Sequence, residues 1–274
     1  MKNSPQPVAN GTAFIRKPVL SLPSVNSGGG QSLIRLAGVV ESEIPCLFSA
    51  EVAVALSHWQ ARPGMVVTVV DAAGVMWRGR LTDLNASGGI LIPFQRSLRP
   101  FESSLALTVY QALPEKERFE LILEKLTELG VTRIVPIISQ HSSTLAARDA
   151  KQPKSHRWPE VLRRAAVQCR RAIIPELSPC LDLASVFTDA NNDTLRLMLY
   201  EGEGTFSLKE TLAGQECRQV ALLVGPEGGF AAEEVAVARC NGFLPVSLGP
   251  RILRTETAAI SAATVIQYAL GDLN

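Results

Sequence analysis

Leu222-Leu-Val-Gly-Pro-Glu-Gly-Gly-Phe230 joins a buried apolar run to a glycine-rich turn, and a helix is predicted directly after it at Ala231–Arg239. Strand, turn and helix in this order form the repeating unit of open α/β sheets. Glycines let a ligand approach the backbone closely, and such sheets bind ligands at the carboxyl ends of their strands. The turn lacks both the Gly-Lys-Ser/Thr of a phosphate loop and the Gly-x-Gly-x-x-Gly of a dinucleotide site. Its composition leaves two interpretations open, a ligand site or a tight structural turn.

A second junction of the same kind follows in Val246-Ser-Leu-Gly-Pro-Arg-Ile-Leu-Arg-Thr-Glu-Thr-Ala258. Pro250 after Gly249 predicts a turn, and Thr255 is a suitable N-cap for a final helix. Ile252 and Leu253 lie between two arginines, Arg251 and Arg254. Such an apolar pair is typical of a pocket wall, because apolar side chains hold an aromatic ring while backbone groups bind its edge. The alternative is an ordinary capped helix with an ion pair at its first turn.

The chain around these junctions alternates between strands and helices. Strands are predicted at Leu105–Ala112, Val131–Ile138, Leu195–Tyr200, Val220–Val224 and Phe243–Leu248. Helices are predicted between Pro114 and Gly130, at His156–Ala172, at Ala231–Arg239 and from Thr255 onward. This order predicts a mainly parallel sheet covered on both faces. The last helix is apolar almost all round, so we expect it to be buried on more than one side, with a subunit interface as one way to achieve this.

The first third of the chain has a different pattern. Met65–Asp71 and Val75–Leu84 predict a hairpin, and Ile90–Leu98 returns beside it, as in a small barrel or meander. Arg99-Pro100 is the expected junction with the α/β part. Residues 1–40 contain no Asp or Glu and include Ser27-Gly-Gly-Gly30, which predicts a flexible tail or an organelle-targeting segment.

The composition is that of a globular protein: 46% hydrophobic and 19% charged residues in 274, with a net charge of +1. No apolar run reaches membrane-spanning length. The five cysteines contain no CxxC pair and the three histidines have no metal-ligand spacing, so we expect no metal site. We expect the cysteines to be free thiols in a reducing compartment, which predicts a cytoplasmic location with an organelle as the alternative. One segment is strongly basic: 151–171 holds seven Lys or Arg against a single acid.

The two junctions resemble the bacterial 16S rRNA uridine-N3 methyltransferases, the RsmE family of the SPOUT superfamily. The resemblance extends upstream to Lys125-Leu-Thr-Glu-Leu-Gly-Val131 with Pro136, and to a block with Arg157-Trp158, Ala165-Ala166, Gln168, Arg171 and Pro175. It covers roughly residues 105–274. The chain departs from the family pattern at His141-Ser142, at Arg164 and around Ser57–Gly64.

The resemblance implies a SPOUT-type parallel sheet whose C-terminal segment forms a trefoil knot, preceded by a small PUA-like β-barrel that binds RNA. The domains are then a flexible tail at 1–32, the PUA-like domain at 33–102 and the methyltransferase domain at 103–274. It also implies homodimerisation through the C-terminal domain and S-adenosylmethionine bound in the two loops. The expected cofactor-binding residues are Gly225, Pro226, Glu227, Gly228, Leu248, Gly249, Ile252, Leu253, Arg254, Thr255, Thr257 and Ala258.

Methylation of uracil N3 sets the expected catalytic roles. The N3 proton is only weakly acidic, so catalysis must align N3 with the methyl donor and favour the N3 anion. Arg254 or Arg251 can stabilise charge on a uracil carbonyl, and Glu227 or Glu256 can accept the proton. The alternative for Glu256 is a first-turn acid that interacts with the helix dipole.

Ribosomal RNA or the small ribosomal subunit is the expected partner, bound through phosphate contacts. The candidate residues are Lys125, Arg157, Arg163, Arg170 and Arg171. A solvated surface is the alternative for this basic segment, and Glu160 four residues before Arg164 predicts a helix salt bridge.

Three other functions are kept as alternatives. The first is an RNA methyltransferase of the same superfamily that acts on a ribose 2′-hydroxyl or on guanine. The second is a non-catalytic RNA-binding paralogue. The third is a nicotinamide-dependent oxidoreductase, which the missing dinucleotide fingerprint disfavours.

Overall fold

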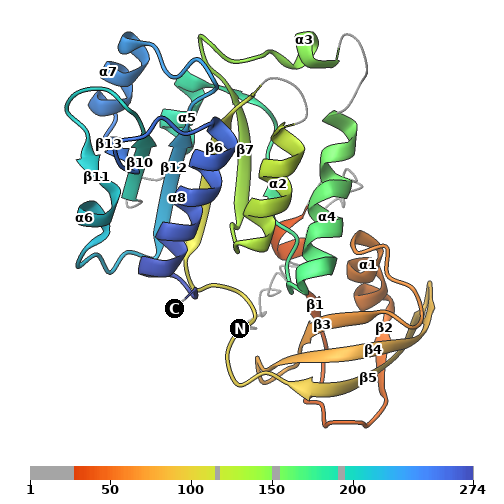
Figure 1. The fold of residues 1–274 in the computed structure, drawn as a ribbon. Helices are drawn as coiled ribbons and strands as arrows, with labels where there is room; N and C mark the ends of the chain where they lie inside the picture. Colours follow the sequence, from red (N-terminus) through yellow and green to blue (C-terminus); the bar gives the residue numbers. More distant parts are fainter. Residues whose placement is uncertain (1–27, 115–117, 150–154, 191–194, 274) are drawn as a thin grey trace, which may run out of the picture.

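The computed structural model describes residues 28–114, 118–149, 155–190 and 195–273, which form a small sheet followed by a large α/β unit (Figure 1). Residues 1–27, most of the predicted tail or targeting segment, lie outside the described residues. No helix of the described residues is long and apolar enough to cross a membrane. All five cysteines are free thiols.

The first sheet contains β1 (Ile34–Arg35), β2 (Cys46–Ser49), β3 (Val66–Val70), β4 (Met76–Asn85) and β5 (Gly88–Arg96), in the order β1-β3-β4-β5-β2. The predicted hairpin of β3 and β4 and the returning β5 are present and antiparallel. Gly74 provides the positive φ (+78°) that the hairpin turn requires. The small β domain also contains a helix that was not predicted, α1 (Ala50–His58), which packs Val52 and Leu56 against this sheet.

The second sheet has eight strands, and every pair in it is parallel. Its order is β11-β13-β10-β12-β6-β7-β8, with β9 beside β7. The strands are β6 (Ala106–Ala112), β7 (Arg133–Ile138), β8 (Glu176–Leu177), β9 (Leu181–Asp182), β10 (Leu195–Leu199), β11 (Phe206–Ser207), β12 (Gln219–Val224) and β13 (Leu244–Ser247). The five predicted strands are present, whereas the short β8, β9 and β11 were not expected.

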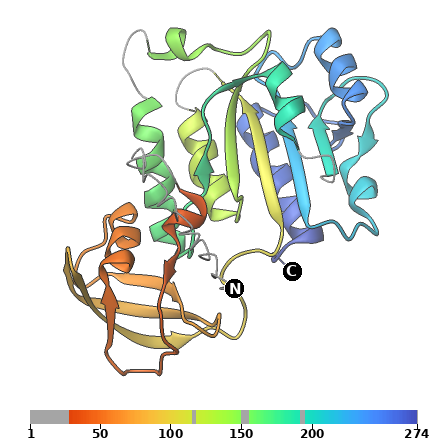
Figure 2. The same cartoon turned by 180° about the vertical axis from the view of Figure 1, so that it is seen from behind.

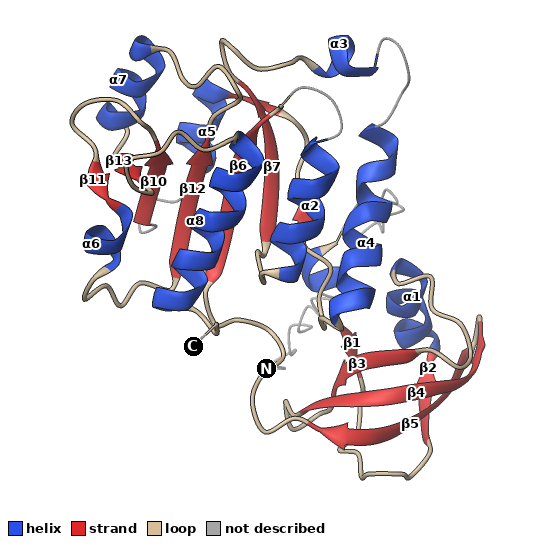
Figure 3. Cartoon of the chain, in the orientation of Figure 1, coloured by secondary structure: helices blue, strands red, loops and turns tan. Residues whose placement is uncertain are grey.

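Helices cover both faces of this sheet, as predicted (Figures 2 and 3). Side chains alternate along each strand, so that Leu222 and Leu223 of β12 belong to two different hydrophobic clusters. One face packs against α2 (Arg118–Glu128), α4 (Trp158–Cys169), α6 (Leu208–Leu212) and α8 (Thr255–Leu270), and the other against α5 (Leu183–Asp189) and α7 (Ala232–Cys240). A short α3 (Leu145–Asp149) and two 3₁₀ turns, η1 (Gly29–Ser32) and η2 (Ser155–Arg157), complete the described elements. Trp158 lies in the core, 4.5 Å from the Phe119 ring between centroids.

The last helix is buried on one side only within this chain. Ala259, Ala263 and Ile266 of α8 are fully buried, but Tyr268 on the same helix is 67% exposed. The expectation that α8 is covered on more than one side therefore fails for the single chain, and a covering partner remains a proposal.

A buried ion pair stabilises the joint between the two parts. Arg171, directly after α4, donates to Glu102 from Nε (3.0 Å) and Nη2 (2.7 Å). Its Nη1 donates to the carbonyls of Thr127 (3.1 Å) and Val131 (2.7 Å). Nearby, Thr68 of β3 donates to the Arg170 carbonyl (3.2 Å) and so attaches the first sheet to the end of α4.

Candidate active site

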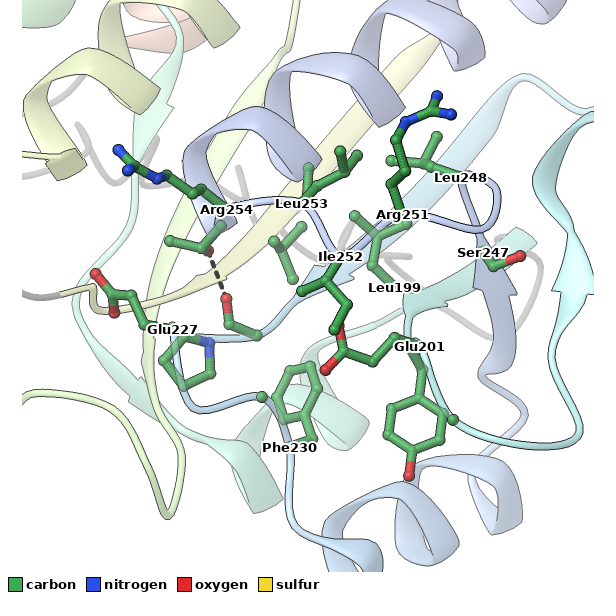
Figure 4. A pocket seen from close by; sticks show the side chains of 18 of the residues that line it. Leu199, Glu201, Glu227, Phe230, Ser247, Leu248, Arg251, Ile252, Leu253 and Arg254 are labelled. Carbon is green, nitrogen blue, oxygen red and sulfur yellow. Dashed lines mark hydrogen bonds between the residues drawn. The ribbon is translucent and has the colours of Figure 1, made fainter.

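A cavity of about 980 Å³ opens at the carboxyl ends of β10, β12 and β13 (Figure 4). Its walls come from three segments, 199–202 after β10, 224–230 after β12 and 246–255 after β13, together with Arg118, Thr205 and Ala258. This is the edge at which parallel α/β sheets bind ligands. Both junctions singled out in the sequence therefore meet at one site.

The loop after β12 is shaped by its glycines and by Phe230. Gly229 has φ +68°, and its amide donates to the Pro226 carbonyl (3.0 Å) to close a tight turn. A Cβ on Gly225 would lie 3.1 Å from the Phe230 ring, so a larger residue would require that ring to shift. His141, where the chain departs from the family pattern, lies against this loop, with Nδ1 3.3 Å from the Gly229 carbonyl.

The loop after β13 lies across the cavity from that turn. Gly249 has φ +116°, a conformation that L side chains rarely adopt, and this allows the chain to reverse after β13. Ile252 is 82% exposed, and Figure 4 shows it pointing toward Glu201 and Phe230. An apolar side chain held open at a cavity is a suitable surface for a planar ring.

Thr255 joins the two loops. Its Oγ1 donates to the Gly225 carbonyl (2.6 Å), the dashed line in Figure 4. Gln111 at the end of β6 donates in turn to Thr255 Oγ1 (3.0 Å). The prediction that Thr255 caps the final helix was wrong: the N-cap is Arg254, whose side chain makes no capping hydrogen bond, and the Thr255 hydroxyl is directed to the other loop instead.

Charged side chains surround the cavity. Arg118, from the start of α2, donates to Glu227 (2.9 Å), and its Nε lies 3.9 Å from a carboxylate oxygen of Glu256. Arg251 and Arg254 are exposed at the rim. Glu256 is not among the lining residues, and its Oε2 is buried and makes no hydrogen bond within the described residues.

The structure brings together all but one of the residues expected to bind the cofactor. The exception is Thr257, which is exposed on α8 and does not line the cavity. Sequence reasoning missed Arg118 and the segment Leu199-Tyr-Glu-Gly202. The latter carried a usable signal, because a glycine-containing turn follows a predicted strand there just as at the two recognised junctions. No sequence signal pointed to Arg118, since it is distant in sequence from both loops.

The candidate RNA-binding residues differ in their availability. Arg171 is only 6% exposed and engaged inside the protein, which corrects the expectation that it contacts phosphates. Arg163 pairs with Glu160 (2.5 Å), as does Arg164 (2.8 Å), the predicted helix salt bridge. The hydrogen bond from Arg163, helped by that from Arg164, lowers the pKa of Glu160 to about 2.

Three further candidates lie at the surface. Hydrogen bonds to Glu124 and Glu128 raise the pKa of Lys125 to about 12, so its ammonium group stays charged. The two carboxylates beside it offset that charge. Arg157 and Arg170, at the two ends of α4, are exposed. No cluster of His, Cys, Asp or Glu suited to a metal ion occurs among the residues that the structure describes.

Known proteins are similar to this chain in both sequence and fold. Residues 101–267 match the model of the RNA methyltransferase domain family. The chain is 34% identical over 207 residues to the ribosomal RNA small subunit methyltransferase E of Mycobacterium bovis, covering 73% of this chain and 77% of that protein. It is 30% identical over 259 residues to the Synechocystis protein of the same name, covering 92% and 84%.

Two solved structures extend this similarity to cofactor complexes. One is a ribosomal RNA small subunit methyltransferase E from Neisseria gonorrhoeae bound to S-adenosylmethionine, with 27% identity, a TM-score of 0.65, and coverage of 88% of this chain and 98% of that one. The other is a methyltransferase from Legionella pneumophila in complex with the same cofactor, with 31% identity, a TM-score of 0.63 and the same coverage.

Proposed function

The chain belongs to the ribosomal RNA small subunit methyltransferase E family, and from that premise we propose that it transfers a methyl group from S-adenosylmethionine to N3 of a uridine in the RNA of the small ribosomal subunit. Dependence on S-adenosylmethionine and action on ribosomal RNA follow from the family and from its cofactor-bound structures. The observation that carries the proposal is the single cavity that both recognised loops enclose. Family membership also argues against a nicotinamide-dependent oxidoreductase.

The residues of the cavity suit this cofactor. Leu248, Ile252 and Leu253 offer apolar surface for the adenine ring. Glu201 places a carboxylate in the wall, which complements the positive charges of the cofactor. When bound, S-adenosylmethionine supplies an electrophilic methyl carbon.

We assign the proton acceptor to Glu227 and not to Glu256. Glu227 lines the cavity and is held by Arg118 at 2.9 Å, whereas Glu256 lies outside the lining and fits the alternative of a first-turn acid beside the helix dipole. Glu227 takes the N3 proton, and the rim guanidiniums of Arg251 and Arg254 stabilise the negative charge that develops on the uracil carbonyls.

The RNA contacts are proposed for the exposed arginines at the ends of α4. Replacing both Arg157 and Arg170 with alanine is expected to weaken RNA binding and to reduce the slope of log K against log salt by about 1.4–1.8, because each lost phosphate contact removes about 0.7–0.9. Binding measured by fluorescence anisotropy over a salt series tests this. Arg164→Ala is the control, since that guanidinium already pairs with Glu160. An unchanged slope in the double variant would remove α4 from the RNA-binding surface.

Three structural features are also proposed from the family. They are a PUA-like identity for the first sheet, a trefoil knot in the C-terminal segment, and a homodimer through the C-terminal domain. The exposed aromatic side chain of Tyr268 on α8 supports the last of these, because a partner subunit would bury it. The mass in solution, measured by light scattering, tests the dimer.

The cytoplasmic location stays a prediction.

The decisive experiment is methyl transfer from labelled S-adenosylmethionine to small ribosomal subunits and to naked RNA. Mass spectrometry of the digested RNA is expected to place the label on uridine N3. Label on a ribose 2′-hydroxyl or on guanine would identify a different target within the superfamily. Cofactor binding by calorimetry without transfer to either substrate would support the non-catalytic paralogue.

A further inference from the structure

A fully buried glutamine lies beneath the two loops, in a strand where the pattern calls for an apolar residue. Gln111 follows Leu107 and Val109 on the face of β6 that α8 covers, and all three have no exposed surface. Its side chain does not line the cavity. Buried polar side chains are kept at a cost in stability, so the position of Gln111 calls for a reason.

Hydrogen bonds connect this side chain to both loops of the cavity. Gln111 Nε2 donates to Thr255 Oγ1 (3.0 Å), and Thr255 Oγ1 donates to the Gly225 carbonyl (2.6 Å). Nε2 also lies 3.4 Å from that same carbonyl and donates to the Ala112 carbonyl (2.9 Å). The chain of bonds therefore links the end of β6, the first residue of α8 and the first residue of the glycine-rich loop.

The threonine hydroxyl links Gln111 to the glycine-rich loop. The Gly225 carbonyl can only accept, so the Thr255 hydroxyl donates to it, and Gln111 Nε2 fills an acceptor position of the same oxygen. Gly225 and Thr255 are both lining residues, from opposite loops. A lost bond at Gln111 would thus loosen the spacing of the two walls without removing any atom from the cavity surface.

The carbonyl oxygen of the same side chain argues against a role in fold stability. Gln111 Oε1 is buried and has no hydrogen-bond partner among the described residues. An unsatisfied buried acceptor destabilises the folded state, and an apolar side chain of similar length would avoid that penalty. A residue retained for stability alone would not carry this defect.

We propose that Gln111 is a positioning residue for the methyl-transfer reaction, which holds the loops at Gly225 and Thr255 at the separation that the cofactor requires. The inference rests on the proposed function, because it takes S-adenosylmethionine as the ligand of the cavity. Gln111 acts through Thr255 and touches neither cofactor nor RNA. It therefore controls cofactor affinity more than fold stability.

The test is Gln111→Met in the full chain, with S-adenosylmethionine affinity measured by calorimetry and the melting temperature by circular dichroism. The dissociation constant is expected to rise about tenfold, the effect of one buried hydrogen bond, while the melting temperature stays the same or rises. Gln267→Met is the matched control. Gln267 is an equally buried glutamine whose Nε2 has no hydrogen-bond partner within the described part of the chain. It lies at the far end of α8, where its Oε1 accepts a hydrogen bond from Ser103 (2.9 Å). Its replacement is expected to leave cofactor affinity unchanged.

Thr255 provides a second route to the same conclusion if Gln111→Met folds poorly. Thr255→Val removes the hydroxyl and is expected to weaken cofactor binding, whereas Thr255→Ser keeps the hydroxyl and is expected to lose less affinity than Thr255→Val. Adding Gln111→Met to Thr255→Val is expected to cause little further loss, because both changes break one chain of bonds. Full affinity in Gln111→Met, or strictly additive losses in the double variant, would overturn the proposal. Failure of the unaltered protein to bind S-adenosylmethionine would instead refute the proposed function.

Discussion

Replacing Arg171 with alanine is expected to lower the free energy of unfolding by about 3–5 kcal/mol, the range for removing one partner of a buried ion pair. The side chains of Arg171 and Glu102 are only 5% and 11% exposed, so solvent screens their interaction little. Without the guanidinium, Glu102 keeps, among the described residues, its bonds from the Ala172 (2.7 Å) and Ile173 (3.0 Å) amides. The carbonyls of Thr127 and Val131 also lose their shared donor.

Denaturant unfolding of the purified chain measures this loss. Arg164→Ala on α4 is the control, because the Arg164 side chain is 75% exposed and its pair with Glu160 belongs to the surface class that contributes about 0–1 kcal/mol. If Arg171→Ala unfolds at the same denaturant concentration as Arg164→Ala, the buried pair does not stabilise the joint between the first sheet and the α/β unit. Loss of RNA affinity by Arg171→Ala at unchanged stability would restore this residue to the RNA-binding candidates.

The example of Arg171 shows which part of the structure can be derived from local pattern. Strand and helix spacing predicted the alternation of elements correctly, since apolar period is a local property. The same pattern cannot say whether a basic residue at the end of a helix faces solvent or a buried acid sixty-nine positions earlier. Glu102 lies at the predicted domain junction, and nothing in its neighbours marks it as a partner.

The short elements were missed for a related physical reason. α1 reads Ala-Glu-Val-Ala-Val-Ala-Leu-Ser-His, and its valines favour a strand when judged alone. It is a helix because Val52 and Leu56, four positions apart, pack together against the first sheet. Tertiary packing overrides propensity in a segment this short.

In the candidate site too, local sequence motifs could be predicted, whereas contacts between distant residues could not. Both loops could be singled out from the sequence because each carries its own glycines and proline, and both line one cavity. What could not be derived is how they meet: Thr255 was expected to cap a helix, and only the folded chain brings its hydroxyl to Gly225, thirty positions away. The participation of Arg118 and Gln111 depends on the same long-range contacts.

The assignment of Glu227 as proton acceptor leads to the largest effect on activity. Glu227→Gln is expected to lower kcat by about 10²–10⁴-fold, the usual contribution of a positioned general base. The amide oxygen of the new side chain can still accept the hydrogen bond that Arg118 donates at 2.9 Å, so the loop and the cofactor affinity are expected to change little. The loss should therefore fall on kcat and not on the dissociation constant of S-adenosylmethionine.

The pH dependence separates a missing base from a damaged site. Without a carboxylate to take the proton, the reaction depends on the fraction of uridine already ionised at N3, and this fraction rises tenfold with each pH unit below the pKa of uridine. Single-turnover methylation by Glu227→Gln is thus expected to accelerate steeply toward alkaline pH and to approach the rate of the unaltered enzyme. Glu256→Gln is the matched control, since that carboxylate lies 3.9 Å from the same arginine but outside the cavity wall. The opposite result would be a large loss of kcat and a steep rise of the rate with pH in Glu256→Gln, with Glu227→Gln nearly unaffected. That result would transfer the role of proton acceptor to Glu256, whose buried oxygen would then have to become accessible when RNA binds.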